Sequence, residues 1–413
     1  MSDDRKLFAE LQSLAKDLLI EKVPPFERMT LLRAAGLDRA LTVRDNEILA
    51  ITAAARKELK GQSDGEELGT VLHIPKENWA VDQLIAAKTF NLVVALQKVG
   101  KSSFISGLLG VWKSGFSNFL GFDFKGDCPP IIIAGTDQPL CDWREILVGA
   151  GLMQEVSADH YELVYPLVKL WHRGSPIHFD EQGIELIAQE AHKHKGAIVF
   201  ADSFAALISP LGLDEWHPSA AEPIHNLCET LEGTDATLIL LHHSSKSRSA
   251  ERASNASRGN NALTAAASQI IQLDWLNKDK KTDQRITLNT EGRNSRPVDL
   301  VIEQQDRSYW ISHGSSEDIE KELKLEEVEA KLNDRQSLVL SILRDKWDNG
   351  RHEVDAVQLV ELIGDELKGS PRVKALSSLD QLTAKGLALK RKTSHPERGT
   401  IACFRPIEAG DLF

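Results

Sequence analysis

The stretch that decides the fold is Leu92-Val-Val-Ala-Leu-Gln-Lys-Val-Gly-Lys-Ser-Ser103. Its composition predicts a buried strand, a turn and the start of a helix, with Gly100-Lys101-Ser102 at the junction. In a P-loop, backbone N–H groups surround the phosphates, the lysine reaches the β- and γ-phosphates, and the next hydroxyl holds Mg²⁺. The sequence therefore predicts a site for ATP and Mg²⁺. The expected nucleotide-binding residues are Ala95, Gln97, Lys98, Val99, Gly100, Lys101, Ser102 and Ser103.

The motif is incomplete, because Ala95 stands where the pattern G-x-x-x-x-G-K-[ST] has its first glycine. A Cβ at this position narrows the allowed backbone angles but does not forbid the loop. The strand, turn and helix context favours a P-loop over a chance Gly-Lys-Ser.

Two further apolar runs end in a carboxylate. Ile198 to Ala201 is followed by Asp202, which we expect to hold the metal together with Ser102. Ile131 to Ala134 leads to Asp137, which could orient the attacking water, since open α/β sheets bind ligands at the carboxyl ends of their strands. These runs alternate with helical patterns, which predicts an α/β fold with a mostly parallel sheet covered by helices.

Composition changes along the chain predict four parts. Residues 1–70 form a helical N-terminal unit that ends in the polar, glycine-rich stretch Gly61 to Gly69. Residues 76–315 form the α/β core. Residues 316–332 form an acidic linker helix, and residues 333–413 form a separate module.

Charge is distributed unevenly. The chain carries a formal net charge of −12, yet nine basic residues and only two acidic ones lie between Lys368 and Arg405. No apolar run is long enough for a membrane span, and the charged N-terminus is unlike a secretory signal, so we expect a cytoplasmic protein. Four scattered cysteines without a C-x-x-C pair indicate neither a zinc site nor a disulfide framework.

The C-terminal module is expected to be a winged helix-turn-helix. Helices are predicted over residues 333–349, 357–363 and 372–385, the last capped by Ser370 and Pro371, before a β-hairpin. Basic residues fall on the third helix and the wing, which favours contact with duplex DNA. A role in protein contacts stays open. The candidate DNA-binding residues here are Arg372, Lys374, Lys390, Arg391 and Lys392.

The order of further motifs resembles plasmid RepA-type hexameric replicative helicases of the wider RecA/DnaB-like group. The resemblance covers about residues 76 to 312. The elements that carry it are Glu77 to Leu84, Asp137-Gln-Pro139, Asp202-Ser203, Leu241-His242-His243-Ser-Ser-Lys246 and Ala256-Ser-Arg258-Gly259. It implies a RecA-like core and a homo-hexameric ring that hydrolyses ATP at subunit interfaces and moves along single-stranded DNA.

The resemblance also implies residue roles. His242 or His243 would sense the γ-phosphate, and Arg258 would be the arginine supplied to the neighbouring subunit's nucleotide. Arg293 resembles an alternative finger, with Glu291 in place of the lysine of a Lys-x-Arg element. The family places a glutamate before the aspartate of the second strand, where this chain has Thr136. Asp137 must then serve alone, or hydrolysis is slow.

The polar stretch between Lys246 and Arg258 is expected to face the ring channel. Its basic residues Lys246, Arg248 and Arg252 could follow the backbone of single-stranded DNA. The leading function is an ATP-dependent DNA helicase or translocase in replication of a mobile element. The alternative is a nucleotide-regulated DNA-binding ring, a loader, clamp or regulator, with weak ATPase activity. A RecA/RadA-type recombinase or a KaiC-like signalling ATPase is disfavoured by the His-His-x-Ser-Lys and Ser-Arg-Gly elements.

Overall fold

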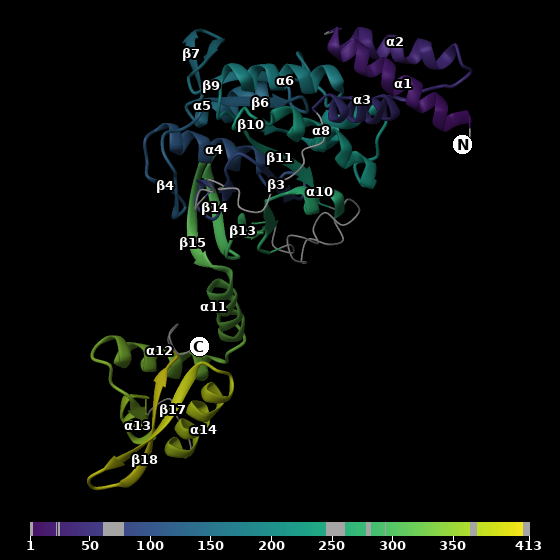
Figure 1. Ribbon diagram of the computed structural model, residues 1–413. Helices are drawn as coiled ribbons and strands as arrows, with labels where there is room; N and C mark the ends of the chain where they lie inside the picture. The colour runs from purple at the N-terminus through teal and green to yellow at the C-terminus, as the bar shows by residue number, and fades with distance from the viewer. Residues whose placement is uncertain are drawn as a thin grey trace, which may run out of the picture. The chain divides into compact units, whose positions relative to one another are not determined.

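The computed structural model (Figure 1) describes residues 3–21, 23, 25–60, 78–244, 261–277, 282–293, 295–363 and 370–407. The chain divides into two compact units, Met1–His313 and Gly314–Phe413. The predicted stretch Gly61 to Gly69 and the predicted loop from Lys246 to Arg258 lie outside the described residues. No described helix has both the length and the apolar character needed to cross a bilayer.

One large sheet organises the first unit. Its strands are β3 (Phe90–Ala95), β6 (Ile131–Gly135), β9 (Leu167–His172), β10 (Ile198–Ala201), β11 (Thr237–His243), β12 (Gln269–Trp275), β13 (Arg285–Gly292), β14 (Asp299–Asp306) and β15 (Tyr309–Ser315). Among the described residues they follow the order β15-β14-β13-β12-β3-β11-β10-β6-β9. The pairs from β12 to β9 are all parallel, whereas β12–β13 and β13–β14 are antiparallel. The predicted α/β fold with a mostly parallel sheet is confirmed.

Helices cover both faces of the parallel strands. They are α4 (Lys101–Lys113), α5 (Leu140–Gly149), α6 (Glu181–Lys193), α7 (Phe204–Ile208), α8 (Glu222–Leu231) and α10 (Asn261–Ala266), with the short 3₁₀ turns η1 (Ser209–Leu211) and η2 (Pro218–Ala221). Successive strand residues face opposite sides, so each strand contributes to two cores. Val199 and Ala201 pack with α6 and α8, whereas Ile198 and Phe200 pack with α4 and α5.

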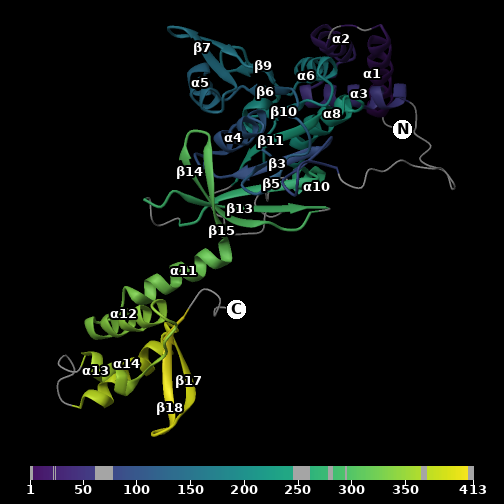
Figure 2. The ribbon, with the colours of Figure 1, turned by 90° about the vertical axis from the view of Figure 1, so that its left-hand side faces the viewer.

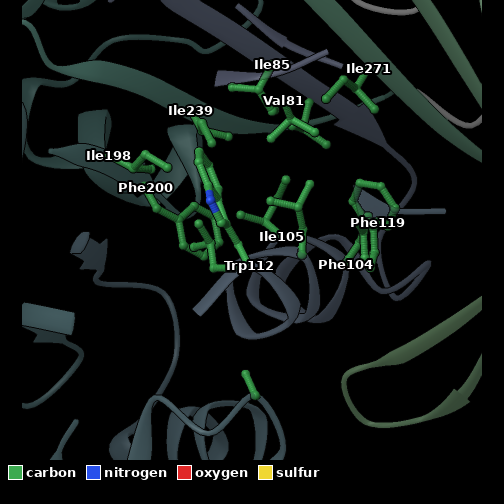
Figure 3. Close-up of a cluster of buried hydrophobic side chains, with 14 of the residues drawn as sticks. Val81, Ile85, Phe104, Ile105, Trp112, Phe119, Ile198, Phe200, Ile239 and Ile271 are labelled. Atoms are coloured by element: carbon green, nitrogen blue, oxygen red, sulfur yellow. The ribbon is translucent and has the colours of Figure 1, made fainter. Parts of the chain in front are cut away.

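Figure 3 shows the second of these cores. Phe104, Ile105 and Trp112 of α4 point toward Phe200 and Ile239 of the sheet, and all are buried. This packing fixes the start of α4 against the carboxyl ends of the strands. The small hairpins around it are β1 (Trp79–Val81) with β2 (Ile85–Ala86), β4 (Asn118–Phe119) with β5 (Phe122–Asp123), and β7 (Met153–Ser157) with β8 (His160–Leu163).

The N-terminal helices lie beside α6 and α8 in both views (Figures 1 and 2). They are α1 (Asp3–Ile20), α2 (Pro25–Leu37) and α3 (Asp45–Lys60). They have an apolar cluster of their own, but Leu49 of α3 joins the core of the sheet.

A buried ion pair ties the N-terminal helices to α6. The Arg28 guanidinium donates to Glu181 Oε1 at 2.7 Å, and the two residues are only 4% and 1% exposed. Arg56 of α3 reaches the same oxygen at 3.3 Å. Burial raises the pKa of Glu181 in spite of both cations. Removing one partner of such a pair is expected to cost roughly 3–5 kcal/mol, because the other charge stays buried.

The second unit packs helices on a small sheet (Figure 2). Its elements are α11 (Ser316–Glu329), α12 (Asp334–Asp348), β16 (Val354–Asp355), α13 (Ala356–Ile363), α14 (Pro371–Ala384), β17 (Ala388–His395) and β18 (Gly399–Pro406). The predicted helices and the hairpin all occur close to their expected bounds. The side chain of Ser370 makes no capping hydrogen bond, so only the first-turn proline acts as predicted.

Candidate nucleotide-binding site

The loop between β3 and α4 has P-loop geometry. Gly100, at the helix N-cap, has φ of +97°, and a Cβ there would lie 3.1 Å from Gln304 Oε1 and 3.3 Å from the Trp310 ring. Glycine is therefore needed at this position. Ala95 is not among the described residues with positive φ, so an alanine meets the backbone requirement where the motif has its first glycine.

Lys101 projects from the first turn of α4 back over this loop. Its Nζ donates to the carbonyl oxygens of Ala95 and Leu96, at 3.1 and 3.0 Å. Nζ also lies 2.9 Å from His243 Nδ1. Burial lowers the pKa of Lys101 to about 8, against the opposing effect of Asp202 and Asp137. The loop carbonyls thus hold the ammonium where the P-loop presents its lysine to phosphate.

Ser102 and Asp202 meet as predicted for a metal site. Ser102 Oγ donates to Asp202 Oδ2 at 2.5 Å, and Gln138 Nε2 donates to both, at 3.0 and 3.1 Å. Burial raises the pKa of Asp202 to about 6, although the hydrogen bond from Ser102 lowers it. A hydroxyl and a carboxylate are the oxygen ligands that Mg²⁺ takes when phosphate and water supply the rest. No cluster of three or more His, Cys, Asp or Glu that could hold a metal occurs within the described residues, so these side chains fit a nucleotide-borne ion.

Comparison with known proteins agrees with this geometry. Residues 58–249 match the family model described as an AAA domain. The first unit has the fold of a RecA-like P-loop ATPase core. No curated protein matches the chain.

Solved structures with a similar arrangement include three proteins of low sequence identity. One is an isolated ATPase domain, which shares 11% identity at a TM-score of 0.40, covering 54% of this chain and 84% of that one. A KaiC-like protein from Pyrococcus horikoshii shares 15% at 0.37, covering 58% and 96%. A DnaB-like replicative helicase shares 10% at 0.41, covering 69% and 76%.

A cavity of about 520 Å³ surrounds the P-loop of this core. Its lining brings together Gln97, Lys98, Gly100, Lys101, Ser102, Ser103, Asp137, Gln138, Pro139, Asp142, Ile146, Arg173, Asp202 and His243. Ala95 and Val99 are buried behind the loop rather than in this lining.

Asp137 and Thr136 turn to opposite sides. Asp137 is exposed at the cavity, and its Oδ2 accepts a hydrogen bond from Ser203 Oγ at 3.3 Å. Thr136 is buried, and its Oγ1 donates to the carbonyl oxygen of Ile177 at 2.7 Å. Thr136 therefore fills a structural position, and Asp137 is the carboxylate of this strand that reaches the nucleotide cavity.

The histidine pair divides in the same way. His243 lines the cavity, and burial together with Lys101 lowers its pKa to about 4. It is neutral near pH 7 and can accept a hydrogen bond from the lysine. His242 is fully buried between the rings of Phe204 and Trp216, and burial lowers its pKa to about 3. Of the two candidates, His243 is the one placed to contact a nucleotide.

The remaining candidates lie elsewhere. Arg293 follows β13 and does not line the cavity; its Nη2 donates to the carbonyl oxygen of Ala265 at 2.5 Å. Arg258, Lys246, Arg248 and Arg252 lie outside the described residues. Arg372, Lys374, Lys390, Arg391 and Lys392 belong to the second unit. Lys390 is already paired with Asp380 at 2.7 Å.

Sequence reasoning missed Gln138 and Arg173. Gln138 was quoted only as part of a motif, and nothing in the sequence pairs it with Ser102 and Asp202. Arg173 follows β9, an edge strand next to β6. Strand order, which brings both residues to the P-loop, cannot be obtained from local patterns.

The shifted pKa values predict a narrow pH window for ATP capture. Asp202 is ionised above about pH 6, and Lys101 is protonated below about pH 8. We therefore expect kcat/KM for ATP, which reports the free protein, to fall on both sides of this window. Bound phosphate favours the ammonium, so the kcat profile should extend to higher pH. A kcat/KM that stays level between roughly pH 5 and pH 9 would contradict these assignments.

Proposed function

We propose that the chain is an ATP-dependent DNA translocase or helicase of the RepA/DnaB-like group that acts as a homo-hexamer in replication of a mobile element. The observation that supports it is the convergence of Lys101, Ser102, Asp137, Asp202 and His243 on one cavity. These are the groups that phosphate binding, metal binding and activation of water require.

The chain's own residues divide the work. Lys101 and the amides at the start of α4 hold the phosphates, while Ser102 and Asp202 hold Mg²⁺, which would neutralise charge on the phosphate oxygens. Asp137 orients the attacking water and accepts its proton. His243 keeps the lysine in place through Nδ1 and senses whether a terminal phosphate is present.

The proposed parts are the helical unit 1–70, the RecA-like core 76–315, the linker helix 316–332 and a winged helix over 333–413. Arg258, with Arg293 as the alternative, would complete the neighbouring subunit's site. Lys246, Arg248 and Arg252 would contact single-stranded DNA in the channel.

A decisive assay compares ATP turnover with and without single-stranded DNA and adds unwinding of a forked duplex. A motor should hydrolyse faster on DNA and separate the strands. Slow turnover that DNA does not change would favour the alternative, a nucleotide-regulated DNA-binding ring. Thr136 favours that alternative, because it leaves Asp137 without the usual neighbouring glutamate. Ala95 does not, since its backbone needs no glycine.

The exposed wing provides a test of duplex binding. Arg391 and Lys392 lie on the exposed part of β17. Reversing both charges, Arg391→Glu with Lys392→Glu, is expected to weaken duplex binding and to lower its salt dependence, because fewer counterions are released. Fluorescence anisotropy at several salt concentrations measures both.

A matched control changes the net charge equally elsewhere in the same unit. Lys331→Glu with Arg335→Glu alters two exposed basic residues that lie outside the hairpin and α14. If the wing and the control variants lose the same affinity, the effect is that of net charge, and the second unit would be assigned to protein contacts instead.

A further inference from the structure

Arg173 enters the nucleotide cavity from a strand that no P-loop motif includes. Strand pairing sets Gly135 opposite His172, which places the next residue beside the loop that carries Asp137 and Gln138. The Arg173 backbone N–H donates to the carbonyl oxygen of Gln138 at 2.9 Å. His172 and Ser175 close a tight turn around it through hydrogen bonds of 3.2 and 2.8 Å. The backbone of Arg173 is therefore held in place.

The side chain is held by one end and otherwise available. Its Nη2 donates to the main-chain carbonyl oxygen of Asp137 at 2.5 Å. Within the described residues it forms no ion pair, and the Asp137 carboxylate instead accepts from Ser203. A guanidinium has several N–H donors in a planar fork that suits phosphate oxygens. The other donors of Arg173 thus remain free to bind an anion in the cavity that it lines.

The position within the cavity indicates which phosphate. The amides of the P-loop and Lys101 lie at the start of α4, whereas Arg173 lies beside Asp137, which is placed to orient the water that attacks the terminal phosphate. We propose that Arg173 binds the terminal phosphate of ATP from within the same subunit and makes the site prefer ATP to ADP. This inference rests on the proposed ATPase function and adds a specificity residue to it.

Calorimetric titration in the presence of Mg²⁺ tests the proposal with two probes, ADP and the slowly hydrolysed analogue adenylyl imidodiphosphate. Arg173→Ala should weaken binding of the triphosphate analogue about tenfold or more, as expected for a hydrogen bond to a charged group, and leave ADP within about twofold. Arg173→Lys should recover part of the difference, since it keeps the charge but loses the fork. Arg307→Ala is the matched control: Arg307 is exposed and paired with Glu145 at 2.9 Å, outside the cavity.

The outcomes separate this role from a structural one. An arginine that only supports the Asp137 loop would lower the affinity for both nucleotides equally when removed, and that result would overturn the proposal. Unchanged affinity for both would overturn it too. If the unaltered protein binds neither nucleotide, the proposed ATPase function fails together with it, whereas equal losses in Arg173→Ala alone leave that function intact.

Discussion

Lys101→Ala is expected to lower ATP turnover by at least on the order of 10³-fold, because the ammonium neutralises charge that develops on the transferring phosphate. We measure it as the steady-state rate of phosphate release. The substitution removes a buried cation whose pKa is already lowered to about 8, so the folded state loses a charge that burial disfavours. The melting temperature should therefore change little.

Lys193→Ala is the matched control, since Lys193 is an exposed lysine at the end of α6 that pairs with Glu190. Its turnover should equal that of the unaltered protein. Undiminished hydrolysis by a folded Lys101→Ala protein would remove the central assignment of the site.

Arg258→Ala is expected to stop hydrolysis while nucleotide binding persists, with a loss of roughly 10³- to 10⁵-fold if the residue is an arginine finger. The finger would act on the neighbouring subunit's nucleotide. Lys101→Ala retains the finger and lacks the P-loop lysine, while Arg258→Ala retains the P-loop and lacks the finger. Mixing the two inactive proteins should then restore some turnover at interfaces where intact halves meet.

Activity that never recovers, in subunits shown to assemble together, would assign Arg258 a role within its own subunit or in structure only. Arg293→Ala would then be tested in the same mixing experiment. Full activity of Arg258→Ala alone would weaken the case for a RepA-like ring.

The sequence predicted the parts of the fold that local patterns encode. β3, β6, β10 and β11 are nearly uninterrupted apolar runs, because both of their faces are buried. β12 was missed, since Gln269, Gln272 and Asp274 interrupt its apolar pattern although all three are buried. The edge strand β9 and the antiparallel strands β13 to β15 also escaped, as partly exposed strands carry a weaker signal.

The site followed the same rule. Lys101, Ser102, Asp202 and Asp137 lie at strand ends with recognisable motifs, so their convergence could be predicted. Gln138 and Arg173 reach the same cavity only because β6 lies between β10 and β9, and strand order depends on contacts between distant segments. The choice of His243 over His242 likewise depends on which side of β11 each ring faces.

The ion pair of Arg28 with Glu181 gives the N-terminal helices a share in the ATPase core's resistance to heat. With Leu49 packed into the core of the sheet, α1 to α3 and the sheet should unfold in one cooperative transition, separate from that of residues 314–413. A substitution in α2, on the other side of α6 from any nucleotide contact, would then lower the temperature at which the nucleotide site is lost. Heat sensitivity arising from the N-terminal helices would be misread as a catalytic defect unless turnover were compared below the melting transition.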